Sequence, residues 1–122
     1  MADVATLAPP VKTLLVPTPN GDTLPRRHSD FSTFGEALDY AASGVRGLNF
    51  HDPRGTLVRP YTFRELREDA LATAYRMIAR GIKPGDRIAL IAETGPDFAA
   101  LFCGAVYAGA WPVPLPDRKS VV

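Results

Sequence analysis

Two glycines near the end of the chain have the spacing found in phosphate-binding loops. Gly104 and Gly109 stand five positions apart, like the two glycines of the P-loop motif, whose backbone N–H groups bind phosphates. The motif also requires Lys and Ser or Thr directly after the second glycine, whereas Ala110 and Trp111 follow here. No side chain there would neutralise phosphate charge. We therefore expect Gly104 to allow close helix packing and Gly109 to end a helix.

A second candidate for anion binding is Thr94 with Gly95. These residues lie where an apolar strand leads into a helix, and the N-terminus of a helix can bind an anion. The segment offers few side-chain donors. We interpret Thr94 as a helix cap.

The other residues that could catalyse a reaction or bind a metal are isolated in the sequence. His28 lies in an irregular segment, and His51 has no second His or a Cys nearby. Asp52 follows His51, which suggests an acid–base dyad, but Asp-Pro-Arg-Gly at 52–55 is typical of a turn. Cys103 falls in an apolar helix and is expected to be a small core residue. We predict no catalytic, cofactor-binding or metal-binding residue in this chain.

Composition and charge argue against several classes of protein. The net charge is +1, and the 14 Lys and Arg residues are scattered, so nucleic acid is not an expected partner. The chain lacks a secretory signal and a run of about 18 apolar residues, so we expect no membrane span. A single cysteine fits a reducing compartment, which predicts a cytoplasmic protein.

The chain divides into a proline-rich head and a structured body. Residues 1–30 hold 5 of the 12 prolines and are expected to be irregular, with one short strand candidate at 11–16. The body, 31–116, has the patterns of regular helices and strands. The last segment, 117–122, does not continue them.

Capping boxes predict where two helices of the body begin. Thr33 with Glu36 starts the first helix, and Thr62 with Glu65 starts the second. Glycines close both, at 44 and 81.

Between these helices the sequence predicts an antiparallel hairpin. Its strands are 48–51 and 56–60, joined by the turn at 52–55. Pro60 cannot donate to a ladder, so the hairpin is expected at a sheet edge.

Residues 83–116 predict a turn, a strand, a helix and a second strand. The turn at 83–86 suits type II, with glycine where φ must be positive. The run 88–92 is continuously apolar, like strands buried on both faces of a parallel sheet. The helix at 98–108 is apolar nearly all round, and the strand at 111–115 should return parallel to the first. The predicted fold is therefore α/β: helix, hairpin, helix, then a parallel βαβ unit.

These motifs resemble the opening of the adenylate-forming enzymes, the superfamily of acyl- and aryl-CoA synthetases, luciferases and peptide-synthetase adenylation domains. That opening reads G-hydrophobic-x-x-G-D-R-V-A, an apolar strand, a polar turn with Pro, an apolar helix, and A-G-A-hydrophobic-hydrophobic-V-P-L. The matching segments here are 81–89, 90–96 and 108–115, and 62–66 resembles Y-T-Y-x-E-L.

Within the superfamily, the chain is most similar to the fatty acyl-AMP ligase branch. The segments that carry this similarity are L-N-F-H-D at 48–52, E-T-G-P-D-F at 93–98 and F-C-G-A-V-Y-A-G at 102–109. The resemblance covers about residues 31–115 and implies that 31–116 is a partial N-terminal region of an AMP-binding ligase domain.

The resemblance implies an enzyme that activates a fatty acid with ATP and Mg²⁺. The carboxylate attacks the α-phosphorus, giving an acyl-adenylate and pyrophosphate, and the thiol of CoA or of an acyl carrier protein then takes the acyl group. The family uses a Ser/Thr/Gly-rich loop with Lys, an aromatic-Gly-x-Thr-Glu segment, an Asp for the ribose and a mobile C-terminal Lys. None of these is in the sequence, and Lys12, Lys83 and Lys119 follow no such loop. We expect this chain alone to be inactive.

Residues 117–122 are expected to be non-native. The hexapeptide D-R-K-S-V-V is a translation of GAT CGG AAG AGC GTC GTG, the start of a widely used short-read sequencing adapter. The alternative is a genuine divergent tail or the end of a natural pseudogene.

Two other functions stay open. One is a non-catalytic interaction module that docks a partner through the apolar helix at 98–108. The other is a loading domain fused to a polyketide or peptide synthetase.

Overall fold

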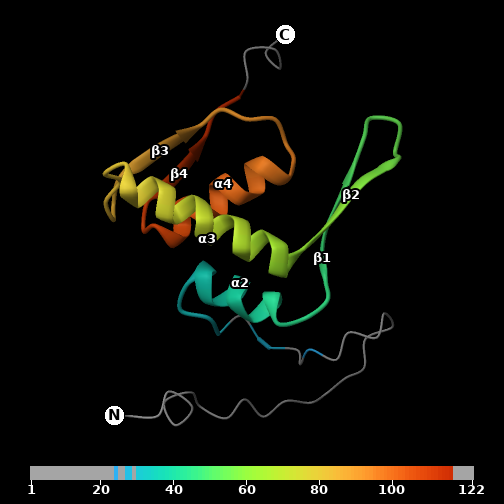
Figure 1. Cartoon of the computed structure of the whole chain (residues 1–122). Helices are drawn as coiled ribbons and strands as arrows, with labels where there is room; N and C mark the ends of the chain where they lie inside the picture. Colours follow the sequence, from blue (N-terminus) through green and yellow to red (C-terminus); the bar gives the residue numbers. More distant parts are fainter. Residues whose placement is uncertain (1–23, 25–26, 29, 117–122) are drawn as a thin grey trace. The chain divides into compact units, whose positions relative to one another are not determined.

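A computed structural model describes residues 24, 27–28 and 30–116 of the chain (Figure 1). The chain separates into two compact units, Met1–Asp30 and Phe31–Val122, and every helix and strand described lies in the second. The strand candidate at 11–16 and the segment 117–122 lie outside the described residues.

The second unit contains helices and strands in the predicted order. They are α2 (Phe34–Ala42), β1 (Gly47–His51), β2 (Leu57–Thr62), α3 (Phe63–Ala79), β3 (Arg87–Leu90), α4 (Pro96–Tyr107) and β4 (Trp111–Pro114). β1 and β2 pair antiparallel, and β3 and β4 form a separate parallel pair. The predicted α/β fold, with a hairpin followed by a parallel βαβ unit, is confirmed.

Helix α2 begins at its predicted cap, Thr33, and Gly44 follows its C-cap as predicted, but the contacts at the two ends differ from a capping box and a left-handed glycine. Thr33 caps it by accepting from the Glu36 N–H at 3.1 Å, but the Glu36 carboxylate accepts from the Ser32 N–H rather than from that of Thr33. The C-cap is Ser43, and Gly44 follows it without a positive φ. The Ser43 hydroxyl donates to a carbonyl of the last turn, so this end does not depend on glycine.

The long helix α3 has the predicted ends. Thr62 and Glu65 form a complete capping box, with each side chain accepting from the backbone N–H of the other at 3.1 and 2.8 Å. At the other end Gly81 has φ +95°, and the Ile82 N–H donates to the carbonyl oxygen of Met77. This six-residue closure is a Schellman motif, which satisfies carbonyls that the end of the helix would leave unpaired.

The hairpin is longer than predicted because its second strand runs past Pro60 to Thr62. Pro60 lies opposite Asn49, and Tyr61, the next residue, is only 1% exposed. The Tyr61 ring contacts the Phe50 ring, and the Arg59 guanidinium lies 4.8 Å from the centroid of the Tyr61 ring. A proline removes one ladder donor but leaves its carbonyl, and the buried tyrosine stabilises the pairing beyond it.

Helices α3 and α4 pack closely where Gly104 lies. A Cβ on Gly104 would be 2.8 Å from the Thr73 Cβ and 2.9 Å from the carbonyl oxygen of Ala70. The neighbours Cys103 and Ala105 are buried in the same contact. The predicted packing role of Gly104 is confirmed.

The two strands of the βαβ unit are joined at their starts. Gly85 has φ +88° in the predicted turn at 83–86, and Gly109 ends α4 with φ +77°. The Gly85 N–H donates to the Gly109 carbonyl at 2.8 Å. The Trp111 N–H donates to the Asp86 carbonyl at 2.7 Å. The turn therefore sets where the second strand begins.

The first parallel strand is shorter and less buried than predicted. β3 ends at Leu90, and only alternate residues are covered: Leu90 is 4% exposed, whereas Ile91 is 68% exposed. The prediction that 88–92 is buried on both faces is wrong for this chain, because α4 packs on one face of a two-stranded sheet.

A polar network joins α2 to the other two helices. The Asp39 carboxylate accepts from Arg67 of α3 at 2.7 Å and from the Tyr107 hydroxyl of α4 at 2.6 Å. Partial burial raises the pKa of Asp39, but these two hydrogen bonds outweigh it and hold that pKa below its usual value. The ionised carboxylate is thus the form that connects the helices.

We expect Gly104→Ser to lower the free energy of unfolding by about 1–3 kcal/mol, because the new Cβ must displace backbone atoms of α3. Urea denaturation of the 122-residue chain measures this. Gly95→Ser is the matched control, since Gly95 is an extended N-cap whose nearest potential contact is 4.0 Å away. Serine is favoured at N-caps, so the control should be neutral or slightly stabilising. Equal effects of both substitutions would contradict a close helix contact at Gly104.

Asp39→Asn should remove part of the pH dependence of stability. A carboxyl whose folded pKa is lowered contributes stability above its unfolded pKa of about 3.9, and that contribution is lost as pH falls through the folded pKa. The variant should be less stable than the parent at pH 7, and the difference should shrink below about pH 4. Thermal unfolding at a series of pH values tests this, with Tyr107→Phe expected to be intermediate. A gap that stays constant down to the lowest pH would contradict the assignment.

Candidate functional site

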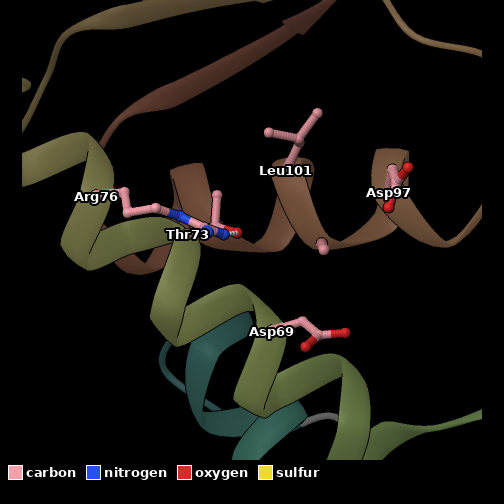
Figure 2. Close-up of a pocket in the computed structure, with 6 residues that line it drawn as sticks. Asp69, Thr73, Arg76, Asp97 and Leu101 are labelled. Carbon is pink, nitrogen blue, oxygen red and sulfur yellow. Dashed lines mark hydrogen bonds between the residues drawn. The ribbon is translucent and has the colours of Figure 1, made fainter.

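A polar cavity of about 440 Å³ lies between α3 and α4. Its lining comprises Asp69, Thr73, Arg76, Asp97, Ala100 and Leu101. Figure 2 shows that Asp69, Thr73 and Arg76 come from α3, with Asp97 and Leu101 on α4. The Arg76 guanidinium donates to the Thr73 hydroxyl at 3.3 Å. Three charged side chains, those of Asp69, Arg76 and Asp97, therefore surround one hollow.

Asp69, Thr73 and Arg76 of this cavity are engaged in structural contacts. The Asp69 carboxylate accepts from the Tyr61 hydroxyl at 2.5 Å. Burial, together with this bond to Asp69, raises the pKa of Tyr61, so its hydroxyl remains a donor. The described lining contains no His, Cys or Lys, and its one hydroxyl, that of Thr73, accepts a hydrogen bond from Arg76. Its chemistry is limited to polar contacts that hold the hairpin against α3.

A second cavity, of about 410 Å³, is apolar and lies among α2, β1, α3 and α4. It is lined by Phe34, Leu38, Leu48, Phe50, Phe63, Leu66, Thr94, Gly95, Phe98, Ala99, Phe102 and Cys103. Burial raises the pKa of the Cys103 thiol, which keeps it protonated and a poor nucleophile. The prediction of Cys103 as a core residue is confirmed.

The helix start at this apolar cavity is not an anion site. The N-cap of α4 is Gly95, one residue later than predicted, and no side chain caps the helix. The prediction that Thr94 caps α4 is therefore wrong. Thr94 and Gly95 face aromatic carbon atoms, which would not compensate the loss of hydration that an anion suffers on binding.

The structure does not bring the remaining candidates together. Asp52 accepts from the backbone N–H groups of Arg54 and Thr56, both at 2.9 Å, so it serves the turn rather than a dyad with His51. Lys83 lies exposed in the turn before β3. Among residues 24, 27–28 and 30–116, no group of three or more His, Cys, Asp or Glu side chains could hold a metal ion.

Sequence reasoning missed two tyrosine hydrogen bonds that join separate elements. Tyr61 with Asp69 and Tyr107 with Asp39 are pairs whose partners come from different elements, and the second pair is 68 residues apart. Neither pair has a motif. The only signal was a tyrosine placed among apolar residues of a strand or helix, since a buried hydroxyl requires an acceptor.

One family model matches this chain. The model described as AMP-binding enzyme matches residues 50–120, more than half of the chain.

Two named proteins are similar to this chain in sequence. A Caulobacter vibrioides protein provisionally named an acyl-CoA synthetase is 41% identical over 105 residues, which are 86% of this chain and 18% of that protein. A linear gramicidin synthase protein of Brevibacillus parabrevis is 39% identical over 54 residues, 44% of this chain and 1% of that protein. The chain therefore spans less than a fifth of either relative.

The fold is shared with a solved structure. A chain from structural and functional studies of the fatty acyl-adenylate ligases of E. coli and L. pneumophila is 42% identical, with a TM-score of 0.75. The match covers 80% of this chain and 18% of that one. With the family match over residues 50–120, these similarities show that the chain belongs to the AMP-binding family of adenylate-forming enzymes.

Proposed function

We propose that this chain is the opening part of an ATP-dependent ligase that activates fatty acids. The observation that carries the proposal is the 42% identity and TM-score of 0.75 to a fatty acyl-adenylate ligase structure. In this proposal the whole enzyme joins a fatty acid to AMP, releases pyrophosphate, and passes the acyl group to a thiol. ATP and Mg²⁺ are the cofactors of that whole enzyme.

The described residues do not fit a site for ATP and Mg²⁺. The polar cavity pairs Asp69 with a tyrosine and Arg76 with a threonine, and it has no third carboxylate or lysine. Magnesium sites in such enzymes use carboxylates together with substrate phosphates, which need neutralising cations. We therefore propose a structural role for this segment: its packed helices and strands support the part of the enzyme that holds the catalytic residues.

The thiol acceptor is proposed to be CoA or an acyl carrier protein. The similarity to the linear gramicidin synthase protein supports a second candidate, a loading domain within a peptide or polyketide synthetase. That match covers 44% of this chain, against 86% for the relative named as an acyl-CoA synthetase. We therefore propose a free-standing ligase first.

We also propose a cytoplasmic location for the enzyme, since fatty acid, ATP and reduced thiol acceptors meet there. In the described part of the chain, every helix is too short or too polar to traverse a lipid bilayer.

The purified chain alone should catalyse no fatty acid-dependent exchange of pyrophosphate into ATP. Exchange requires groups that stabilise the phosphates, and the described residues do not assemble them. A fatty acid AMP ligase from L. pneumophila is the positive control in the same assay. Exchange that depends on acid and survives repurification of the chain would refute the structural role.

A chimera tests the proposed function of the parent. Residues 31–116 would replace the matching segment of the 42% identical ligase. We expect fatty acid-dependent exchange within about tenfold of the intact ligase, a change of about 1.4 kcal/mol in barrier, because no catalytic group is exchanged. A chimera that folds, judged by circular dichroism and thermal unfolding, yet lacks activity with fatty acids would contradict the proposal.

A further inference from the structure

Prolines occupy every second position of β4 and of the residues that follow it. They are Pro112, Pro114 and Pro116, and the structure describes all three. In a β-strand the backbone N–H and C=O groups of one residue point to the same edge, and those of the next residue point to the opposite edge. Residues two apart share an edge, so the three prolines lie together on one edge of the strand.

Two hydrogen bonds identify which edge this is. The Trp111 N–H donates to the Asp86 carbonyl at 2.7 Å, and the Leu115 N–H donates to the Leu90 carbonyl at 2.9 Å. Trp111 and Leu115 therefore face β3, and Val113 between them does so by the same alternation. The prolines face away from β3, toward the outer edge of β4.

The outer edge of β4 therefore offers carbonyl acceptors but no N–H donor from 112 to 116. A ladder between strands uses both groups, which is why proline is confined to edge strands and bulges. The outer edge of β3 differs, because Arg87 and Ala89 keep their N–H groups. Among the described residues, neither outer edge has a neighbouring strand (Figure 1). One edge of this sheet can pair with a further strand by a full ladder, and the other cannot.

This difference determines how copies of the chain can associate. If both edges were complete, β3 of one copy could pair with β4 of the next, and a head-to-tail contact of that kind repeats into an open filament. The prolines remove that contact. The pairing that remains, β3 with β3, is isologous and closes at two copies, because both outer edges of the resulting sheet are proline edges.

The side chains of these strands make such protection necessary. Trp111 is 66% exposed and Ile91 is 68% exposed. An unpaired strand edge beside exposed apolar side chains is a template for aggregation, and proline on an edge is one of the means by which proteins prevent it.

We propose that Pro112, Pro114 and Pro116 form a protective device, which prevents strand addition at the outer edge of β4 and so blocks open-ended assembly of the chain. The inference goes beyond the proposed function and does not depend on it, because it uses only the register and hydrogen bonds of the β3–β4 pair.

Restoring the missing donors tests the proposal. The double variant Pro112→Ala/Pro114→Ala, made in the full 122-residue chain, returns two N–H groups to the outer edge of β4. The parent should remain a monomer or a dimer up to the highest concentration tested. The variant should form species larger than dimers at least about tenfold below that concentration, because each contact gains two hydrogen bonds. Light scattering and sedimentation measure both.

The matched control is Val113→Ala/Leu115→Ala. It shortens two side chains at neighbouring positions whose N–H groups already face β3, so it adds no donor to the outer edge. It should assemble no further than the parent. Circular dichroism and thermal unfolding report whether each variant is folded. If the double proline variant does not fold, Pro114→Ala alone restores one donor and should assemble at a concentration between those of the parent and a two-donor edge.

Amide hydrogen exchange locates the new contact. The amides introduced at positions 112 and 114 should exchange at least about tenfold more slowly in the assembled variant than in its dilute form, because strand pairing protects them.

Three results would overturn the proposal. One is a parent chain that itself forms open β-sheet filaments. Another is a folded proline variant that assembles no further than Val113→Ala/Leu115→Ala. The third is an assembled variant whose amides at 112 and 114 stay unprotected, since another surface would then hold the copies together.

Discussion

The close contact between α3 and α4 is the constraint on which the rest of this unit depends. Gly104 allows the two helices to approach until a single added carbon would overlap Thr73 and the Ala70 carbonyl. α3 also joins the hairpin through the Tyr61–Asp69 hydrogen bond, and α4 joins the parallel strands. The hairpin and the parallel pair form two separate sheets, so they are held in one unit mainly by this helix pair.

Polar contacts then fix the third helix. Asp39 on α2 receives donors from both α3 and α4, so a single carboxylate links the positions of three helices. Each donor is partly exposed, and exposed ion pairs contribute little to stability. The network sets orientation, whereas the apolar side chains around Leu38 and Leu66 supply most of the burial.

The sequence predicted the features that depend on neighbouring residues. The capping box at Thr62, the positive φ of Gly85 and the parallel pairing after α4 all follow from local rules about caps, turns and crossovers. The extension of β2 to Tyr61 did not, because it depends on a ring buried by distant elements. Burial of 88–92 on both faces was predicted wrongly, because the apolar pattern describes a larger sheet than the two strands present. For the candidate site, the sequence predicted no catalytic or cofactor-binding residue, because it lacks the family's phosphate-binding motifs.

The hydrogen bond between Gly85 and Gly109 has a consequence for how the chain folds during synthesis. This bond joins the two ends of a single crossover connection. The chain entropy lost on closing so short a loop is small, so the βαβ unit can form early in folding. Chains emerge from the ribosome N-terminus first, so the parallel pair can form before any later part of a chain is made. At that stage Ile91 and Trp111 are exposed to solvent, 68% and 66%. Transiently exposed apolar surface of this kind makes folding intermediates prone to aggregate.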